Sequence, residues 1–135
     1  MASDRIWGNR SEKTVILDSN AVMMLFEFQI NLEDELVKLI GKNKIIIPKT
    51  IRDELEFLSK NGKGKKRINA KASLELIKKY EIVDIDVKNA DDSIFQLAKQ
   101  TCSYVLTNDK ELRQRLKKNS IHVIFLRAKK KLQIE

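Results

Sequence analysis

The chain has 135 residues, of which 42% are hydrophobic, and this suits one globular domain with a single core. No apolar run is long enough to span a membrane and no signal peptide is recognisable, so we expect a cytoplasmic protein without a membrane partner. A single cysteine, Cys102, excludes an intrachain disulfide and a multi-cysteine zinc site. The formal net charge of +8 favours a polyanionic partner.

The first third of the chain shows two helical patterns after a short strand. Residues 1–13 are mostly polar and are expected to form an N-terminal arm. The β-branched run 15–17 predicts a strand buried on both faces. A helix is expected over 21–28 and another over 31–40. Met23 and its apolar neighbours in the first of these helices are interpreted as core, with a homodimer interface as the second interpretation.

Strands and helices continue to alternate in the rest of the chain. A strand over 44–48 is followed by a helix that begins near Thr50, which with Asp53 resembles a capping box. The segment 60–66 contains two glycines and is expected to be a loop. The remaining elements are helix 68–80, strand 82–87, helix 91–101, strand 104–107, helix 109–118 and strand 122–126. This order predicts a three-layer α/β/α fold with a central parallel sheet of four or five strands.

Carboxylates stand where several of these apolar segments end. Asp18 follows the first strand, Asp91 and Asp109 open two later helices, and Glu54 lies at the edge of the apolar stripe of its helix. In an open α/β sheet, strand ends and the first turns of the following helices open into one crevice. Four carboxylates there repel one another unless a cation lies between them. Oxygen ligands without nearby histidine or cysteine fit Mg²⁺ or Mn²⁺.

Each of these acids also has a structural interpretation. Asp18 and Asp109 are both placed to cap the following helix, and Glu54 could pair with one of the many lysines. For Asp18 the capping role is the weaker one, because Ser19 and Asn20 offer capping groups of their own. The joint pattern of the four acids, rather than any single one, predicts the metal site.

Ser19 and Asn20 are expected to support this site, and so are two further side chains. On a helix that starts near Asp91, the neighbouring Asp92 is turned about 100° away, so it is expected at the rim as an auxiliary acid and additional metal ligand. Thr107 ends a strand, where its hydroxyl could orient a water or a ligating carboxylate. An acidic metal site beside basic segments is the electrostatic arrangement expected of a nuclease.

Positive charge gathers in the segments 60–67, 113–118 and 127–131. The last segment overlaps a predicted basic C-terminal tail, 128–135, which follows a folded domain over 14–127. The alternative is a solvated surface that binds nothing. The residues expected to contact a polyanionic partner are Lys63, Lys65, Lys66, Arg67, Arg113 and Lys129.

The acidic motifs resemble those of the PIN-domain ribonucleases. The matching segments, which spread over residues 14–126, are Leu17-Asp18-Ser19-Asn20, Pro48 to Glu54-Leu55, Ala90-Asp91-Asp92-Ser93-Ile94 and Thr107-Asn108-Asp109. The resemblance implies that Asp18, Glu54, Asp91 and Asp109 bind one or two divalent ions and carry endonucleolytic RNA hydrolysis. It also implies that water is the nucleophile and that the products end in 5′-phosphate and 3′-hydroxyl groups.

Within that family, Ala90-Asp91-Asp92 together with the segment from Thr107 to Leu116 looks most like the branch of single PIN domains, of archaeal type, that processes precursor ribosomal RNA. Ribonuclease toxins of toxin–antitoxin modules usually carry a Thr-Arg-Asn turn with an Asp three residues after the Asn, and here that position is Leu112. Precursor rRNA is therefore the expected partner. The alternatives are a catalytically inactive RNA-binding factor of ribosome assembly and a toxin of this kind.

Overall fold

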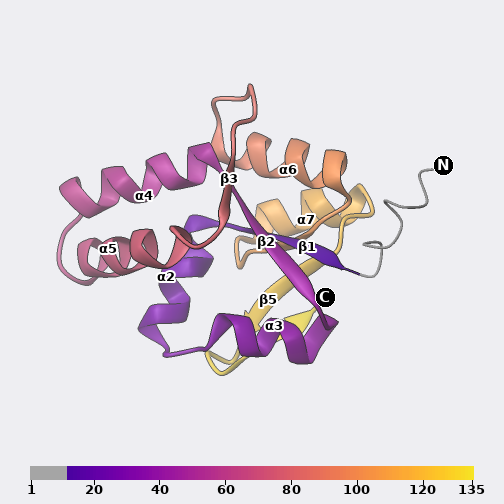
Figure 1. Cartoon of the computed structure of the whole chain (residues 1–135), viewed down its shortest axis with the longest axis horizontal. Helices are drawn as coiled ribbons and strands as arrows, with labels where there is room; N and C mark the ends of the chain where they lie inside the picture. Colours follow the sequence, from indigo (N-terminus) through magenta and orange to yellow (C-terminus); the bar gives the residue numbers. More distant parts are fainter. Residues whose placement is uncertain (1–11) are drawn as a thin grey trace.

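A computed structural model describes residues 12–135 as one sheet with helices packed around it (Figure 1). Most of the predicted N-terminal arm, residues 1–11, lies outside the described residues. The strand order is β3-β2-β1-β4-β5-β6, with β1 to β5 parallel and β6 antiparallel to β5. The strands are β1 (Lys13–Leu17), β2 (Asn43–Pro48), β3 (Glu81–Val83), β4 (Tyr104–Leu106), β5 (Val123–Arg127) and β6 (Lys131–Ile134).

Six helices of the described segment connect these strands. They are α2 (Ser19–Glu27), α3 (Leu32–Ile40), α4 (Lys49–Asn61), α5 (Lys65–Ile77), α6 (Ala90–Thr101) and α7 (Lys110–Lys118). The chain moves outward from β1 to β2 and β3 through α2 to α5, then returns past β1 to β4 and β5 through α6 and α7. Because such crossovers are right-handed, the two sets of helices cover opposite faces of the sheet. The predicted three-layer fold is confirmed. Within residues 12–135, each helix is too short or too polar to traverse a lipid bilayer.

The centre of the sheet explains where the acids lie. Val15, Ile16 and Leu17 are fully buried, and Ile16 pairs with Ile46 of β2 and with Val105 of β4. A strand buried on both faces reads as a continuous apolar run, as the sequence indicated. The order of the strands reverses between β1 and β4, and the edge outside such a reversal is the usual place for a site in an open α/β sheet.

The segment 60–66 is not the loop that its glycines suggested. Helix α4 continues to Asn61 and α5 begins at Lys65, so only three residues connect the two helices, which pack side by side as a hairpin (Figure 1). A Cβ on Gly62 would come within 2.5 Å of the Leu58 carbonyl oxygen, and Gly64 has a φ of 58°. The two glycines therefore permit a tight turn rather than a mobile segment.

The predicted capping box at Thr50 is also wrong. Helix α4 already begins at Lys49, with Pro48 in the cap position and no side-chain cap. The Thr50 hydroxyl instead bonds to the Ser93 hydroxyl of α6, with the oxygens 2.5 Å apart. Ser93 is fully buried, so this contact ties the start of α4 to the start of α6.

The C-terminal residues belong to the sheet rather than to a tail. A turn at Ala128 and Lys129, both with positive φ, reverses the chain after β5. Strand β6 then pairs with β5, with Lys131 opposite Arg127 at one end and Ile134 opposite Ile124 at the other. Leu132 of β6 is buried. The sheet thereby gains a sixth strand beyond the four or five that were predicted. Strand β3, in contrast, is only three residues long and not the six predicted over 82–87.

Candidate active site

Asp18 is the most buried acid at the carboxyl edge of the sheet. It directly follows β1, and only 7% of its surface is exposed. Although it occupies the cap position of α2, its side chain makes no capping hydrogen bond, so the structural alternative for this residue is wrong. Burial raises the pKa of Asp18 from 3.8 to about 6, and the negative charges of Asp91 and Glu54 add to the increase.

Thr107 connects Asp18 to the end of β4. Its buried hydroxyl donates to Asp18 Oδ2 over 2.8 Å and accepts from the backbone N–H of Asp109 over 3.1 Å. Of the two roles expected for this hydroxyl, orienting a carboxylate is the one that these bonds favour. Asp109 accepts from the N–H of Leu112 over 3.0 Å, so its capping role is confirmed. Its other carboxylate oxygen has no hydrogen bond within residues 12–135.

Glu54 approaches the same edge from α4. Ser19, which is buried in the first turn of α2, donates its hydroxyl to Glu54 Oε1 over 2.6 Å. Glu54 itself is exposed, because the buried stripe of α4 runs through Ile51, Leu55 and Ser59. It pairs with no lysine in the described part of the chain. The described residues therefore do not support an ion pair with a lysine, which was the alternative from the sequence.

Asp91 lies in the first turn of α6, within the electrostatic reach of the other acids. Its pKa is raised, first by desolvation and then by the negative charges of Asp109, Glu54 and Asp92, while the positive charge of Arg115 lowers it. Together with the coupling of Asp18 to Asp91 and Glu54, this brings Asp18, Glu54, Asp91 and Asp109 into one cluster. We call these four residues the acidic site.

Asp92 has a different environment from Asp91. Arg115 of α7 donates from Nη1 to Asp92 Oδ1 over 2.7 Å, and its guanidinium lies 4.3 Å from the centre of the Phe95 ring. The sequence indicated Arg115 only as one cation of the basic segment 113–118. Its contacts with Asp92 and Phe95 were missed, because these partners lie on another helix about 20 positions away and leave no local signal. The pairing gives Asp92 an anchoring role for this cation.

The donor set fits a hard divalent cation. All four acids offer carboxylate oxygens, and the buried Asp18 beside like charges is the kind of group that a cation stabilises. As the side chains stand, no three Asp, Glu, His or Cys residues among 12–135 are arranged to hold a metal ion together. Mg²⁺ commonly keeps several waters and takes only one or two carboxylates, so this arrangement is compatible with it.

Asn20 and the expected RNA-binding residues have different environments. Asn20 is exposed in the first turn of α2. Lys63, Lys65 and Lys66 are exposed at the tip of the α4–α5 hairpin, whereas Arg67 donates from Nε to the Ser59 carbonyl oxygen over 3.2 Å. The side chain of Arg67 is thus restrained by a hydrogen bond within the hairpin, and the three lysines are better placed to contact a ligand.

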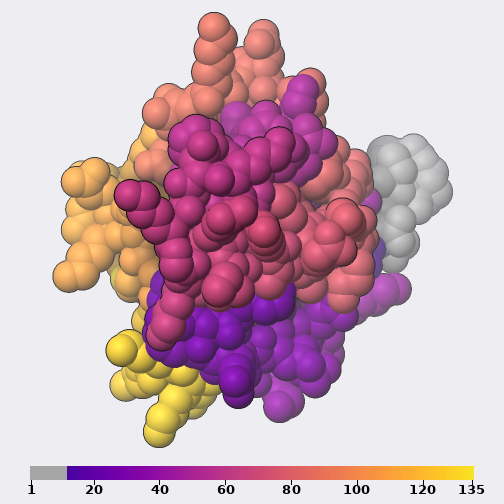
Figure 2. All heavy atoms as spheres, turned by 90° about the vertical axis from the view of Figure 1, so that its left-hand side faces the viewer, coloured from indigo at the N-terminus to yellow at the C-terminus, as the bar shows by residue number. Residues whose placement is uncertain are grey.

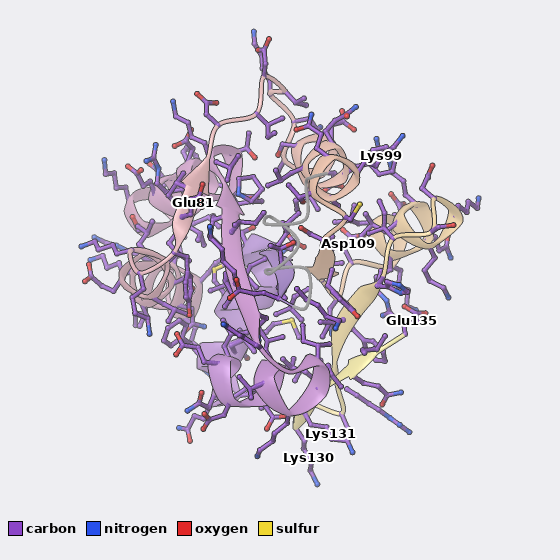
Figure 3. All side chains as sticks on the ribbon, turned by 45° about the vertical axis from the view of Figure 1, so that its right-hand side comes forward. Glu81, Lys99, Asp109, Lys130, Lys131 and Glu135 are labelled. Carbon is purple, nitrogen blue, oxygen red and sulfur yellow. The ribbon has the colours of Figure 1, made fainter. Side chains whose placement is uncertain are left out.

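The other two expected RNA contacts are held against aromatic rings. Arg113 pairs with Glu135 over 2.8 Å and lies 4.4 Å from the centre of the Phe125 ring. Lys129 lies 5.4 Å from the centre of the Phe28 ring. Its neighbours Lys130 and Lys131 lie well apart from Asp109, and Glu135 lies beside α7 (Figure 3). Among these cations, Arg115 is the one whose charge lowers the pKa of Asp91.

Comparison with known proteins agrees with the fold and the motifs. The profile of a family described as "PIN like domain" matches residues 15–129. Ribonuclease VapC4 of Methanocaldococcus jannaschii is 35% identical over 124 residues, which cover 89% of this chain and 95% of the relative. Ribonuclease VapC9 of Archaeoglobus fulgidus is 26% identical over 127 residues, covering 94% and 93%. The PIN domain endonuclease Utp24 superimposes with a TM-score of 0.78 at 29% identity, covering 93% of this chain and 92% of that structure.

Proposed function

Because the chain belongs to the PIN-like domain family, we propose that it is a metal-dependent endoribonuclease. The observation that carries the proposal is the buried Asp18 carboxylate, held by Thr107 next to Asp91 and Glu54. A cation bound between these carboxylates would relieve their mutual repulsion. The ribonucleases VapC4 and VapC9 and the endonuclease Utp24 support RNA hydrolysis as the reaction.

Asp18 and Asp91 are the proposed direct ligands of Mg²⁺ or Mn²⁺. Glu54 and Asp109 complete the site, directly or through water. A bound divalent ion would neutralise charge on the scissile phosphate and make a water molecule more acidic. Thr107 fixes the orientation of the Asp18 carboxylate, and Ser19 fixes that of Glu54, so neither acid has to be ordered when the substrate arrives.

The basic residues would supply the affinity for RNA. Exposed lysines contact phosphates without reading bases, and such contacts position the strand at the acidic site. Arg115 is held on the Phe95 ring by Asp92 and has donors left for a phosphate oxygen. In this proposal Asp92 anchors Arg115 and is not a metal ligand.

Precursor ribosomal RNA is the proposed substrate class. The Thr107-Asn108-Asp109 turn and the structural similarity to Utp24 support it. The second candidate is a ribonuclease toxin of a toxin–antitoxin module, which the similarity to VapC4 and VapC9 favours. Mapping of rRNA ends after depletion in the host distinguishes them: new unprocessed ends support the first candidate, whereas intact processing together with growth arrest on induction supports the second.

The chemistry itself is tested with Asp18→Asn. We expect this variant to lose Mn²⁺-dependent cleavage of structured RNA while it still binds RNA, because one neutral amide replaces the central carboxylate. Asp34→Asn, an exposed acid of α3, is the matched control and should cleave normally. Cleavage by Asp18→Asn at the rate of the unmodified protein, or equal cleavage in EDTA, would refute the proposal. No cleavage by the unmodified protein in the presence of Mn²⁺ would instead favour the inactive RNA-binding alternative.

A further inference from the structure

One face of α4 leads from the acidic site to the hairpin tip. Glu54, Phe57 and Asn61 follow one another at spacings of three and four residues, so their side chains lie on the same face of the helix. All three are exposed. At 1.5 Å per residue, the face extends about 10 Å from Glu54 to Asn61.

Phe57 is the unusual member of this face. Its surface is 62% exposed, more than that of any other aromatic residue in the described segment. Packing of α4 does not require it, because Ile51, Leu55 and Ser59 form the buried stripe. A single exposed apolar side chain is common and by itself means little. Here, however, Ile68 of the adjoining helix α5 is 66% exposed as well, and cations surround the tip.

The cations at the tip find no ion-pair partner in the described part of the chain. Lys60, Lys63, Lys65 and Lys66 are exposed and form no ion pair within residues 12–135. On α7, in contrast, Glu135 neutralises Arg113 and Lys117, and Asp92 pairs with Arg115. The tip is therefore a part of the surface where positive charge is left for an external anion.

The same charges do not help α5 to fold. Three cations occupy its first turn, which contains no acid. The N-terminal end of a helix carries a partial positive charge, so cations there are disfavoured and acids are preferred. Cations at a helix start contradict this local preference, and such exceptions are expected where the residues have a function other than folding.

We propose that this face of α4, the hairpin track, holds a single-stranded segment of RNA that leads to the acidic site. A base stacks on Phe57, and the adjoining phosphates contact Lys60 and the lysines at the tip. The track rests on the proposed ribonuclease function and assigns its substrate a single-stranded segment next to the cleaved bond. Figure 2, which looks onto the side of the molecule where the hairpin tip lies, shows α4 and α5 exposed there.

RNA fits this surface better than a protein partner does. Positively charged surface with an aromatic side chain is the usual platform for single strands, because every base has a face that can stack. A stable protein–protein interface needs a larger apolar surface than the exposed side chains of Phe57 and Ile68 provide. A protein partner, or a second copy of the chain, is left as an outcome of the test.

Binding is measured in the Asp18→Asn background in EDTA, so that neither cleavage nor metal affects the result. The probes are a short unstructured RNA and a blunt RNA duplex of the same length. We expect Phe57→Ala to weaken single-strand binding roughly tenfold and duplex binding much less, because paired bases cannot stack on the ring. Phe57→Trp should keep the affinity. Phe26→Ala, an exposed aromatic residue of α2, is the matched control and should bind normally.

The salt dependence separates stacking from charge. Phe57→Ala should leave the slope of log affinity against log salt unchanged, whereas Lys63→Ser with Lys65→Ser and Lys66→Ser should flatten it by roughly 0.7 for each lost phosphate contact. Arg67 is left intact because it bonds within the hairpin.

Unchanged single-strand affinity in Phe57→Ala would overturn the track, and so would an equal loss for duplex RNA. If Phe57→Ala changed only the molecular mass measured by sedimentation and not the affinity for RNA, the track would be overturned as well. The face would then be assigned to contact with a second copy of the chain. Since all binding is measured without cleavage, these outcomes are independent of whether Asp18 is catalytic.

Discussion

Thr107 donates a hydrogen bond of 2.8 Å to Asp18, although 89 positions separate the two residues in the sequence. The bond joins the ends of β4 and β1, the two strands between which the order of the sheet reverses. It also lowers the pKa of Asp18 against the larger effect of burial. One hydroxyl therefore orients this carboxylate and favours its charged form.

Replacing Thr107 with valine should impair the site more than the fold. The variant keeps the shape of the side chain but removes a hydrogen bond to a charged group, a contribution of about 1.5–3 kcal/mol. We expect weaker Mn²⁺ binding in a calorimetric titration and a shift of the pH–activity profile to higher pH. Thr101→Val removes a hydroxyl bonded to the Leu97 carbonyl, away from the acidic site, and serves as control. Equal Mn²⁺ affinity in the two variants would contradict the role given to Thr107.

Asp18 should make the stability of the metal-free protein depend on pH. Its pKa in the folded state is about 6, against 3.8 for the unfolded chain, so the folded state binds more protons between these values. Stability should therefore fall as pH rises through this window, by about 3 kcal/mol in all. In Asp18→Asn this contribution is absent, and the variant should be the more stable protein above pH 6 but not below pH 4. Urea denaturation in EDTA at several pH values measures the difference, and parallel curves for the two proteins would contradict it.

Divalent metal should offset the same destabilisation. A ligand that binds only the folded state raises its stability in proportion to its affinity and concentration. We expect Mn²⁺ to raise the melting temperature of the unmodified protein at pH 7.5 and to have little effect on Asp18→Asn. Ca²⁺ and Mg²⁺ in parallel scans report the preference for the ion. A similar rise in both proteins would mean that Mn²⁺ binds elsewhere.

The acids could be recognised from the sequence because each one has a defined position in a local pattern of apolar residues. A short apolar run ends at Asp18, and helical spacing separates Asp91 from Asp92. The parallel sheet then brings strand ends and helix starts to one edge, whatever the intervening loops contain. The predicted strand over 82–87 was too long because Asp84 and Asp86 alternate with apolar residues, which is the pattern of a strand. In the described structure, the pairing of β3 with β2 ends at Val83.

Features that depend on tertiary contacts were not predictable in this way. The hairpin between β5 and β6 turns at Ala128 and Lys129, which lack the Asn-Gly signal of such turns, and the lysines around it suggested a tail. The pairing of Arg115 with Asp92 joins two helices, and so does that of Thr50 with Ser93. Each of these contacts needs the fold before it can be recognised.

Removal of residues 128–135 tests whether the C-terminal segment is part of the fold. Truncation exposes the core around the buried Leu132, whose burial contributes about 1.5–3 kcal/mol, and also removes the pairs of Glu135 with Arg113 and Lys117. We expect a lower urea midpoint than in the full chain. Glu135→Gln alone should cost under about 1 kcal/mol, because solvent-accessible ion pairs contribute little. An unchanged midpoint in the truncated protein would mean that the strand adds no stability.

Arg115 and Arg113 lie two positions apart on α7 and should behave differently when each is replaced by alanine. Arg115 lies beside the acidic site, since its charge lowers the pKa of Asp91, while Arg113 is held by Glu135 and the Phe125 ring. Arg115→Ala should reduce kcat/KM for RNA and move the pH–activity profile to higher pH. It should also flatten the salt dependence of RNA binding by roughly 0.7, the value for one phosphate contact on a single strand.

Arg113→Ala should instead lower the urea midpoint slightly and leave the RNA salt slope unchanged, because its guanidinium is already occupied within the protein. Arg115→Lys separates charge from geometry: the lysine keeps the positive charge but has no planar fork to stack on Phe95 while bonding to Asp92 and a phosphate. We therefore expect it to restore the salt slope but not kcat/KM. The same salt slope in Arg113→Ala and Arg115→Ala would show that the position next to the acidic site gives Arg115 no special contact with RNA.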